Sequence, residues 1–259
     1  MLSSGNSPQV SAATAAADFF SQTASVEAVL LVGSWAHGRA DTASDIDIVL
    51  LVSPQTRATE REEILASWEQ AAPRQQSAEL LGPLVRYSDI EVSVVDGEFS
   101  PQPRGWTSGP DDFELRLGNY VAYSRPLFER TGRYHDLRDQ WLPFYDEKVR
   151  TERLQAARTF FLNNVDHIGW SLGRADSFHA FERLYHAHHE FLQALFISRR
   201  IYPIAYDKWV TAQLTDLLGM PDIASDLARI IGVGNLNPSA LAARATELQR
   251  LFDDQIHVP

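Results

Sequence analysis

The sequence contains no cysteine, which excludes disulfide bonds and thiolate metal sites. It also lacks any run of ~18 apolar residues, the length that a membrane-spanning helix needs. Residues 1–14 are small and polar, unlike a secretory signal. We therefore expect a protein without membrane contact and take the cytoplasm as its default location. Lysine is scarce as well, because Lys148 and Lys208 are the only lysines among 23 basic residues.

Charge of one sign dominates. The chain has 34 acidic and 23 basic residues, a net charge of −11, and most of the acidic excess lies in the first 130 residues. An acidic body repels phosphate backbones, so nucleic acid is an unlikely partner. Divalent cations and cationic small molecules are favoured.

The hydrophobic pattern divides the chain into two halves. Short apolar runs over 27–32, 46–52 and 90–95 predict strands, with helices over 10–22 and 57–71, the second stopping at Pro73. Long helical patterns then cover 145–172, 175–199, 205–219, 221–231 and 238–255. We predict an α/β domain over 1–135, with a mixed sheet flanked by helices, and an all-α helical bundle over 136–259.

Loops and aromatic residues complete this outline. The segment 100–110 carries several prolines and glycines and is predicted to be a loop. Large aromatic side chains are more often buried than functional. Four aromatic residues could line a pocket but are expected in the core on this ground: Trp106, Tyr120, Trp141 and Trp170.

The first predicted strand runs directly into Gly33 and Ser34. Glycine allows a tight turn and lets the backbone approach a phosphate without a Cβ in the way. Ser34 offers an amide and a hydroxyl, and a short helix over 35–38 would add further N–H groups. A Gly-Ser pair is also common in simple turns, so the pair alone does not decide between these interpretations.

Asp45 and Asp47 open the second strand. Two residues apart on a strand, they project from one face, whereas Ile46 and Ile48 point the other way into a core. Two carboxylates this close repel each other unless a cation lies between them, and a site with only oxygen donors suits Mg²⁺ or Mn²⁺. In the alternative interpretation Asp45 is a cap and Asp47 a solvated strand residue, but the apolar run that follows argues against it.

Glu91 lies between Ile90 and Val92 in the third apolar strand. A buried lone carboxylate is expensive unless it is paired or binds a metal. Asp89 shares its face and competes for the role, although Glu91 sits deeper in the apolar run. The alternative is an edge strand with an acidic outer face.

Taken together, GSWAHGRADTASDIDIVLLV followed by IEVSVV resembles the polymerase-β-like nucleotidyltransferase superfamily over roughly residues 25–97. Within it, the motifs look most like those of the streptomycin/spectinomycin adenylyltransferases, which also append a helical C-terminal domain. The C-terminal half matches more loosely and implies no particular acceptor.

This resemblance implies roles for the motif residues. Asp45, Asp47 and Glu91 would be metal ligands, and Glu91, the third acid, would also be the general base. Ser34 and Ser44 would contact phosphate next to Gly33. The implied cofactors are two Mg²⁺ ions, with Mn²⁺ as a substitute, and ATP as co-substrate. An acceptor hydroxyl would displace pyrophosphate at the α-phosphorus.

Lys208 is a candidate for the triphosphate. The resembling adenylyltransferases use a lysine of their C-terminal domain in this way, and Lys208 follows a proline-broken connection at an expected helix start. Arg199 and Arg200 are the other candidates. The competing interpretation is a solvated surface lysine.

Glu182, His186 and Glu190 recur at i, i+4 and i+8 of the predicted helix 175–199, on one face. Three interpretations remain open. The residues form a solvated polar face, His186 and Glu190 bind zinc, or Glu182 and Glu190 pair with the ammonium groups of an acceptor.

We therefore expect a nucleotidyltransferase that moves AMP from ATP to a hydroxyl of a small molecule. Its most specific version is resistance to an aminoglycoside-like antibiotic. One alternative is nucleotidylation of a protein or RNA, as in toxin–antitoxin systems, and another is a non-catalytic nucleotide-binding regulator. The presence of all three acids speaks against the regulator, which needs no general base.

Overall fold

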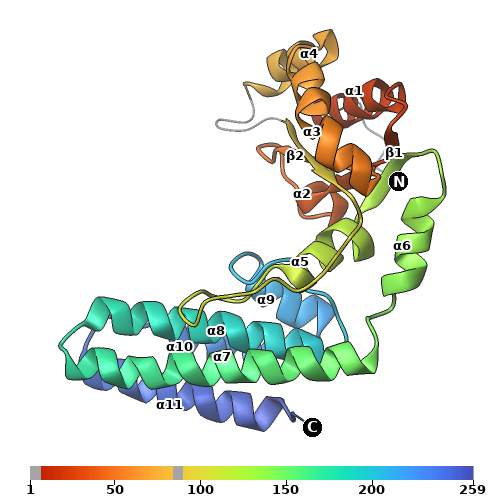
Figure 1. Cartoon of the computed structure of the whole chain (residues 1–259). Coiled ribbons are helices and arrows are strands. Elements are labelled where there is room, and N and C mark those ends of the chain that lie inside the picture. Colours follow the sequence, from red (N-terminus) through yellow and green to blue (C-terminus); the bar gives the residue numbers. More distant parts are fainter. Residues whose placement is uncertain (1–6, 84–89, 259) are drawn as a thin grey trace. The chain divides into compact units, whose positions relative to one another are not determined.

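A computed structural model describes residues 7–83 and 90–258 (Figure 1). The chain forms two compact units. The first comprises residues 7–83, 90–100 and 116–142 of the described chain, and the second comprises 101–115 and 143–258. The proline-rich segment 101–115 thus belongs to the second unit. Because compactness does not establish independent folding, the division into domains 1–135 and 136–259 stays a prediction.

In the described residues the first unit contains a four-stranded mixed sheet with the order β3-β2-β1-β4. The strands are β1 (Val26–Val32), β2 (Ile46–Val52), β3 (Ile90–Val95) and β4 (Arg125–Glu129). β1 pairs antiparallel with β2 and with β4, whereas β2 and β3 are parallel. The α/β class and the three strands predicted from apolar runs are confirmed. β4 was not predicted, because its sequence RPLFE has neither an apolar run nor a clear alternation.

One face of this sheet forms the core of the first unit. Helices α1 (Pro8–Ser21), α3 (Pro54–Glu69) and α4 (Ala72–Leu81) supply side chains to an apolar cluster with alternate residues of the strands. Ile46 and Ile48 belong to this cluster, as predicted. The predicted helix 57–71 corresponds to α3, which ends at Glu69 before Pro73, as expected, whereas α4 was not predicted. Pro73 lies in the first turn of α4, where a proline has no hydrogen bond to lose.

The other face of the sheet carries α6 (Arg133–Trp141), which contacts β1 as does the π-helix η1 (Gly118–Ala122) that follows α5 (Phe113–Leu117). Leu137 from α6 and Leu51 from β2 meet beside Gly97. The short helix α2 (Gly33–Ala36) follows β1 directly.

The second unit is all-helical, as predicted. Its main helices are α7 (Glu147–Gly173), α8 (Ser177–Arg199), α10 (Pro221–Ile231) and α11 (Pro238–Gln255), and α7, α8 and α11 contact one another (Figure 1). Phe161 and Phe252 stack in its core with ring centroids 4.3 Å apart. Within the described ranges, none of the helices combines the length and apolar character needed to span a bilayer.

The predicted helix 205–219 begins later than expected. The structure has α9 (Val210–Ala212) followed by the π-helix η2 (Gln213–Leu217). Trp209 adopts a left-handed conformation with φ 51°, which interrupts a helix. The side chain of Gln213 holds the preceding loop, since it accepts from the amide of Ile204 and donates to the carbonyl of Lys208.

Candidate functional site

Gly33 and Asp47 share one small space at the end of β1. Gly33 has φ +63°, and a Cβ built on it would lie 1.8 Å from Oδ2 of Asp47. The register of β1 and β2 pairs Val32 with Asp47, which brings the carboxylate against the turn. Only glycine therefore fits at position 33, both because of its conformation and because the carboxylate occupies the side-chain position.

The same carboxylate is aligned with a second acid. Asp47 and Glu91 are direct partners in the parallel pairing of β2 and β3, so both side chains lie on the same face of the sheet. Asp45 precedes Asp47 by two residues and is half-buried, as Asp47 is. The face that carries these acids is the one opposite to the apolar cluster with Ile46 and Ile48.

The expectation that Glu91 is a buried carboxylate is wrong. β3 lies at the edge of the sheet that the structure describes, and Glu91 is exposed. Because Glu91 is exposed, it has no desolvation cost that a bound cation would have to offset. It belongs to the site because it pairs with Asp47 in the register of β2 and β3. Asp89, its competitor, lies outside the described residues, so its role stays a prediction.

The two serines differ in their hydrogen bonding. Ser34 is buried, and its hydroxyl has no hydrogen-bond partner among the residues that the structure describes. A buried polar group without a partner is uncommon in native proteins and calls for an explanation. The hydroxyl of Ser44 instead accepts from the amide of Asp41 at 2.9 Å and closes a turn before Asp45. A phosphate contact by Ser44 stays a prediction.

These residues fit a hard divalent cation. Asp45, Asp47 and Glu91 offer only oxygen atoms, the donors that Mg²⁺ and Mn²⁺ prefer. The orphaned hydroxyl of Ser34 lies in the residue next to the glycine that the Asp47 carboxylate contacts. In residues 7–83 and 90–258, no group of three His, Asp or Glu side chains is already gathered as a metal site. Metal binding through these three acids stays a prediction.

His37 was not predicted to belong to the site. It follows α2, and its Nε2 lies 3.0 Å from Oδ1 of Asn119 in the π-helix η1, while its ring packs edge-on against Tyr123. Burial lowers the pKa of His37, so the ring is neutral near pH 7. This contact ties the end of the Gly33–Ser34 turn to η1. No signal in the sequence pairs residues 82 positions apart.

Comparison with known proteins agrees with this geometry. Residues 15–80 match the family model described as polymerase beta, nucleotidyltransferase. Over these residues the chain is similar to the nucleotidyltransferase domains of the polymerase-β-like superfamily. The match includes Gly33, Ser34, Asp45 and Asp47 and ends before Glu91.

A solved structure of a nucleotidyltransferase-like protein from Exiguobacterium sibiricum is similar to the chain at 12% sequence identity and a TM-score of 0.47. The similarity covers 95% of this chain and 74% of that one. No curated protein matches the chain.

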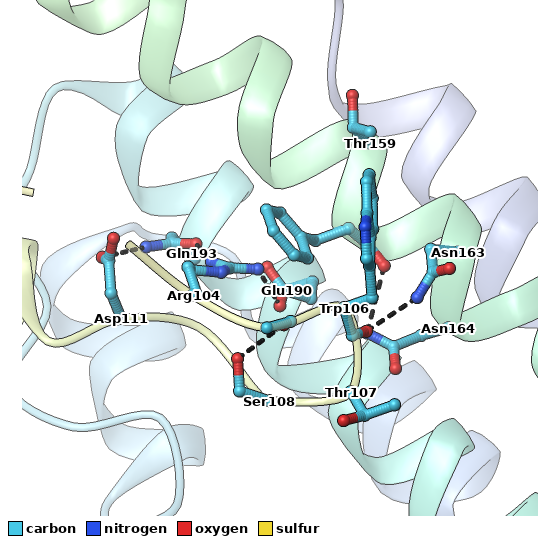
Figure 2. Close-up of polar contacts among 12 residues, drawn as sticks. Arg104, Trp106, Thr107, Ser108, Asp111, Thr159, Asn163, Asn164, Glu190 and Gln193 are labelled. Atoms are coloured by element: carbon cyan, nitrogen blue, oxygen red, sulfur yellow. Dashed lines mark hydrogen bonds and ion pairs between the residues drawn. The ribbon is translucent and has the colours of Figure 1, made fainter. Parts of the chain in front are cut away.

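In the second unit, the three predicted residues of α8 have different environments. Glu182 is exposed, His186 is half-buried, and Glu190 is fully buried, so a uniformly solvated face is excluded. Glu190 forms an ion pair with Arg104 from the segment 101–115 (Figure 2). Burial raises the pKa of Glu190 to about 7 even with Arg104 beside it. Of the two glutamates proposed to bind an acceptor, only Glu182 is open to solvent.

Lys208 is exposed and lies just before α9. Its side chain is accordingly available for an anion, and its contact with a triphosphate stays a prediction. The core assignment of the aromatic residues is wrong for two of them, because Trp106 is 58% and Trp170 is 61% exposed. Tyr120 and Trp141 are half-buried.

Two neighbouring histidines of α8 differ in burial, since His188 is buried and His189 is half-buried. His188 is 6% exposed, and its ring lies 5.4 Å from that of His189. Burial lowers the pKa of His188 to about 3 and that of His189 to about 4. Both rings are therefore neutral in the folded protein at pH values at which an unfolded histidine is charged.

Gly33→Ala tests the shared space. We expect the added methyl group to displace the Asp47 carboxylate. The free energy of unfolding should fall by more than the ~1–2 kcal/mol that a left-handed backbone conformation costs an alanine. Gly38→Ala is the matched control, because Gly38 has φ +69° but no atom within 4 Å of its Cβ position. Chemical denaturation measures both variants. Equal losses of stability would contradict the shared space.

His188→Gln tests the buried histidine through pH. Since the folded pKa lies below the unfolded value of 6.5, unfolding takes up a proton, and stability falls as the pH drops from 6.5 towards 3. In the variant, the free energy of unfolding should depend less steeply on pH, by about 1.4 kcal/mol per pH unit. His257→Gln, at an exposed histidine, should keep the wild-type profile. Denaturation curves at pH 4, 5, 6 and 7 decide between these outcomes.

Proposed function

We propose that the protein is a metal-dependent nucleotidyltransferase that moves AMP from ATP to a hydroxyl of a small molecule. The alignment of Asp47 with both Gly33 and Glu91 supports this proposal most directly. One carboxylate lies against a backbone turn without a Cβ and beside a second acid on the neighbouring strand. A strand whose acidic residues are simply exposed to solvent would require neither the contact with Gly33 nor the alignment with Glu91.

The residues at the turn would bind the nucleotide. Gly33 would contribute its backbone to the phosphate site, and Ser34 would donate its orphaned hydroxyl to a phosphate oxygen. Asp45 and Asp47, together with Glu91, would hold Mg²⁺ or Mn²⁺ next to it. Bound there, the ions neutralise charge that develops on the phosphate groups as pyrophosphate leaves.

Glu91 would act as the general base. Its carboxylate is exposed on the edge strand, so an acceptor can approach it from solvent, and it lies on the same face as Asp47. There it would accept the proton of the attacking hydroxyl. Asp89 remains the competing base. Lys208, with Arg199 and Arg200 as alternatives, would offset charge on the leaving pyrophosphate.

The acidic composition favours a cationic acceptor. With a net charge of −11, the chain attracts amines and repels polyanions. An aminoglycoside-like antibiotic combines amines with hydroxyl groups and is the most specific version of the proposal. The same chemistry on a protein is the main alternative.

Asp47→Asn and Glu91→Gln test the assigned roles. Each should lower kcat for pyrophosphate release by about 100-fold or more, the scale for removing a preorganised charged group from an active site. Glu98→Gln is the matched control, because Glu98 is an exposed acid beyond the other end of β3 and should leave kcat unchanged. An Asp47→Asn protein with most of its activity would contradict the metal assignment.

The acceptor is tested by incubating the protein with labelled ATP and Mg²⁺ against a panel of aminoglycosides, spectinomycin and lincosamides. Pyrophosphate release with an antibiotic and transfer of the label to it support the proposal. Label on a protein supports the alternative. ATP binding without turnover in any arm indicates a non-catalytic regulator and contradicts the proposed activity.

A further inference from the structure

The short helix that carries Ser34 needs support from other parts of the first unit. α2 spans only four residues, and no side chain caps its N-terminus. An isolated helical turn is unfavourable, because it fixes several backbone dihedral angles for one hydrogen bond. The amide of His37 donates to the carbonyl of Gly33 at 3.2 Å. The amide of Arg39 donates to the carbonyl of Ser34 at 2.9 Å. Contacts beyond these local bonds must therefore keep α2 in one conformation.

The side chain of His37 makes such a contact. Its Nε2 lies 3.0 Å from Oδ1 of Asn119, and its ring centroid lies 5.2 Å from that of Tyr123. Because an amide oxygen only accepts, the imidazole carries its proton on Nε2 and donates it. Burial lowers the pKa of His37, and the positive charges of Arg39 and Arg125 act in the same direction. The result is a hydrogen bond of fixed direction between two neutral groups.

The acceptor Asn119 lies in an element that is itself held in place. η1 is a π-helix, a rare geometry that occurs frequently at functional sites. Arg138 of α6 donates to the carbonyl of Val121 at 2.6 Å, and the hydroxyl of Ser124 donates to that of Tyr120 at 2.7 Å. η1 also contacts β1, the strand that runs into the turn. Asn119 is therefore a fixed point to which the end of α2 is attached.

The group whose use depends on the position of α2 is the hydroxyl of Ser34. It is buried and has no hydrogen-bond partner in the described ranges, so it is free to donate to a bound group. Ser34 precedes His37 by three residues, within the same turn of the chain. Hydrogen bonds weaken steeply outside their narrow range of distances, so a displacement of the turn by ~1 Å is enough to lose one.

We propose that His37 and Asn119 are positioning residues for the nucleotide. Their hydrogen bond fixes the end of α2, and the turn then holds the hydroxyl of Ser34 where a phosphate oxygen accepts from it. Neither residue needs to touch the nucleotide. The inference rests on the proposed function, because it takes MgATP to be the ligand of the turn.

Calorimetric titration with MgATP tests the hydrogen bond. His37→Ala should weaken binding by about tenfold, the scale of one lost hydrogen bond to a charged group. His37→Gln should bind within about twofold of wild type, because its amide nitrogen can replace Nε2 as the donor. His135→Ala is the matched control, since His135 lies in the same unit but contacts Glu129 of β4. It should bind MgATP as the wild type does.

The acceptor can be removed without altering α2. Asn119→Ala should weaken MgATP binding to the same extent as His37→Ala, and the double variant should be no weaker than either single one. This variant also keeps the test available if His37→Ala does not fold. Circular dichroism establishes which of the variants are folded.

A second cycle separates positioning from general stabilisation. In a Ser34→Ala protein the hydroxyl to be positioned is missing, so a further His37→Ala should cost little additional affinity for MgATP. A contact that serves only the stability of the fold would weaken binding equally in both backgrounds. Such equal losses would overturn the positioning role, as would folded His37→Ala and Asn119→Ala proteins that bind MgATP as tightly as wild type.

The failure of this inference and that of the proposed function are distinguishable. MgATP binding that depends on His37 through Ser34, without pyrophosphate release, supports the positioning role and contradicts the transferase activity. Pyrophosphate release with an unchanged KM for ATP in His37→Ala leaves the activity in place and contradicts the positioning role. A wild-type protein that does not bind MgATP overturns both.

Discussion

The site depends on one steric constraint, the space that Gly33 leaves for the carboxylate of Asp47. A side chain at position 33 and an acid at position 47 exclude each other, so the turn after β1 and the start of β2 are adapted to one another. The sheet register extends the constraint, because the residue beside Asp47 on the next strand is Glu91. The hydroxyl of Ser34 follows next in the chain and lacks a partner among the described residues. Neighbouring strands thus align two acids, and the turn beside Asp47 carries a buried hydroxyl donor.

In the second unit, buried charged side chains position a surface residue. Buried charges such as Arg104, Glu190 and Arg183 contribute little net stability, yet they fix the conformation of the segment 101–115. The same holds for Arg153, which pairs with Asp111 and with the buried Glu114 of that segment. The main chain that carries the exposed Trp106 is thereby held in place.

The sequence was most informative where a pattern is local. Apolar runs located β1, β2 and β3, and the Gly-Ser and Asp-Ile-Asp motifs located the residues that the structure brings together. It was least informative where tertiary contacts decide. β4 is a strand through its antiparallel pairing with β1, and the main chain at Trp106 is held by Arg183, 77 residues away. The burial of Glu190 likewise depends on Arg104, which no helical periodicity can reveal. Glu91 was predicted to be a buried carboxylate, but it is exposed. Its pairing with Asp47 depends on the register of β2 and β3, which the sequence alone does not reveal.

A crystal structure with Mn²⁺ and a non-hydrolysable ATP analogue tests the central claim most directly. The account predicts an anomalous manganese peak bound by the carboxylates of Asp45 and Asp47, with the hydroxyl of Ser34 hydrogen-bonded to a phosphate oxygen. Manganese and nucleotide bound elsewhere on the protein, with the Ser34 hydroxyl still unpaired, would contradict it.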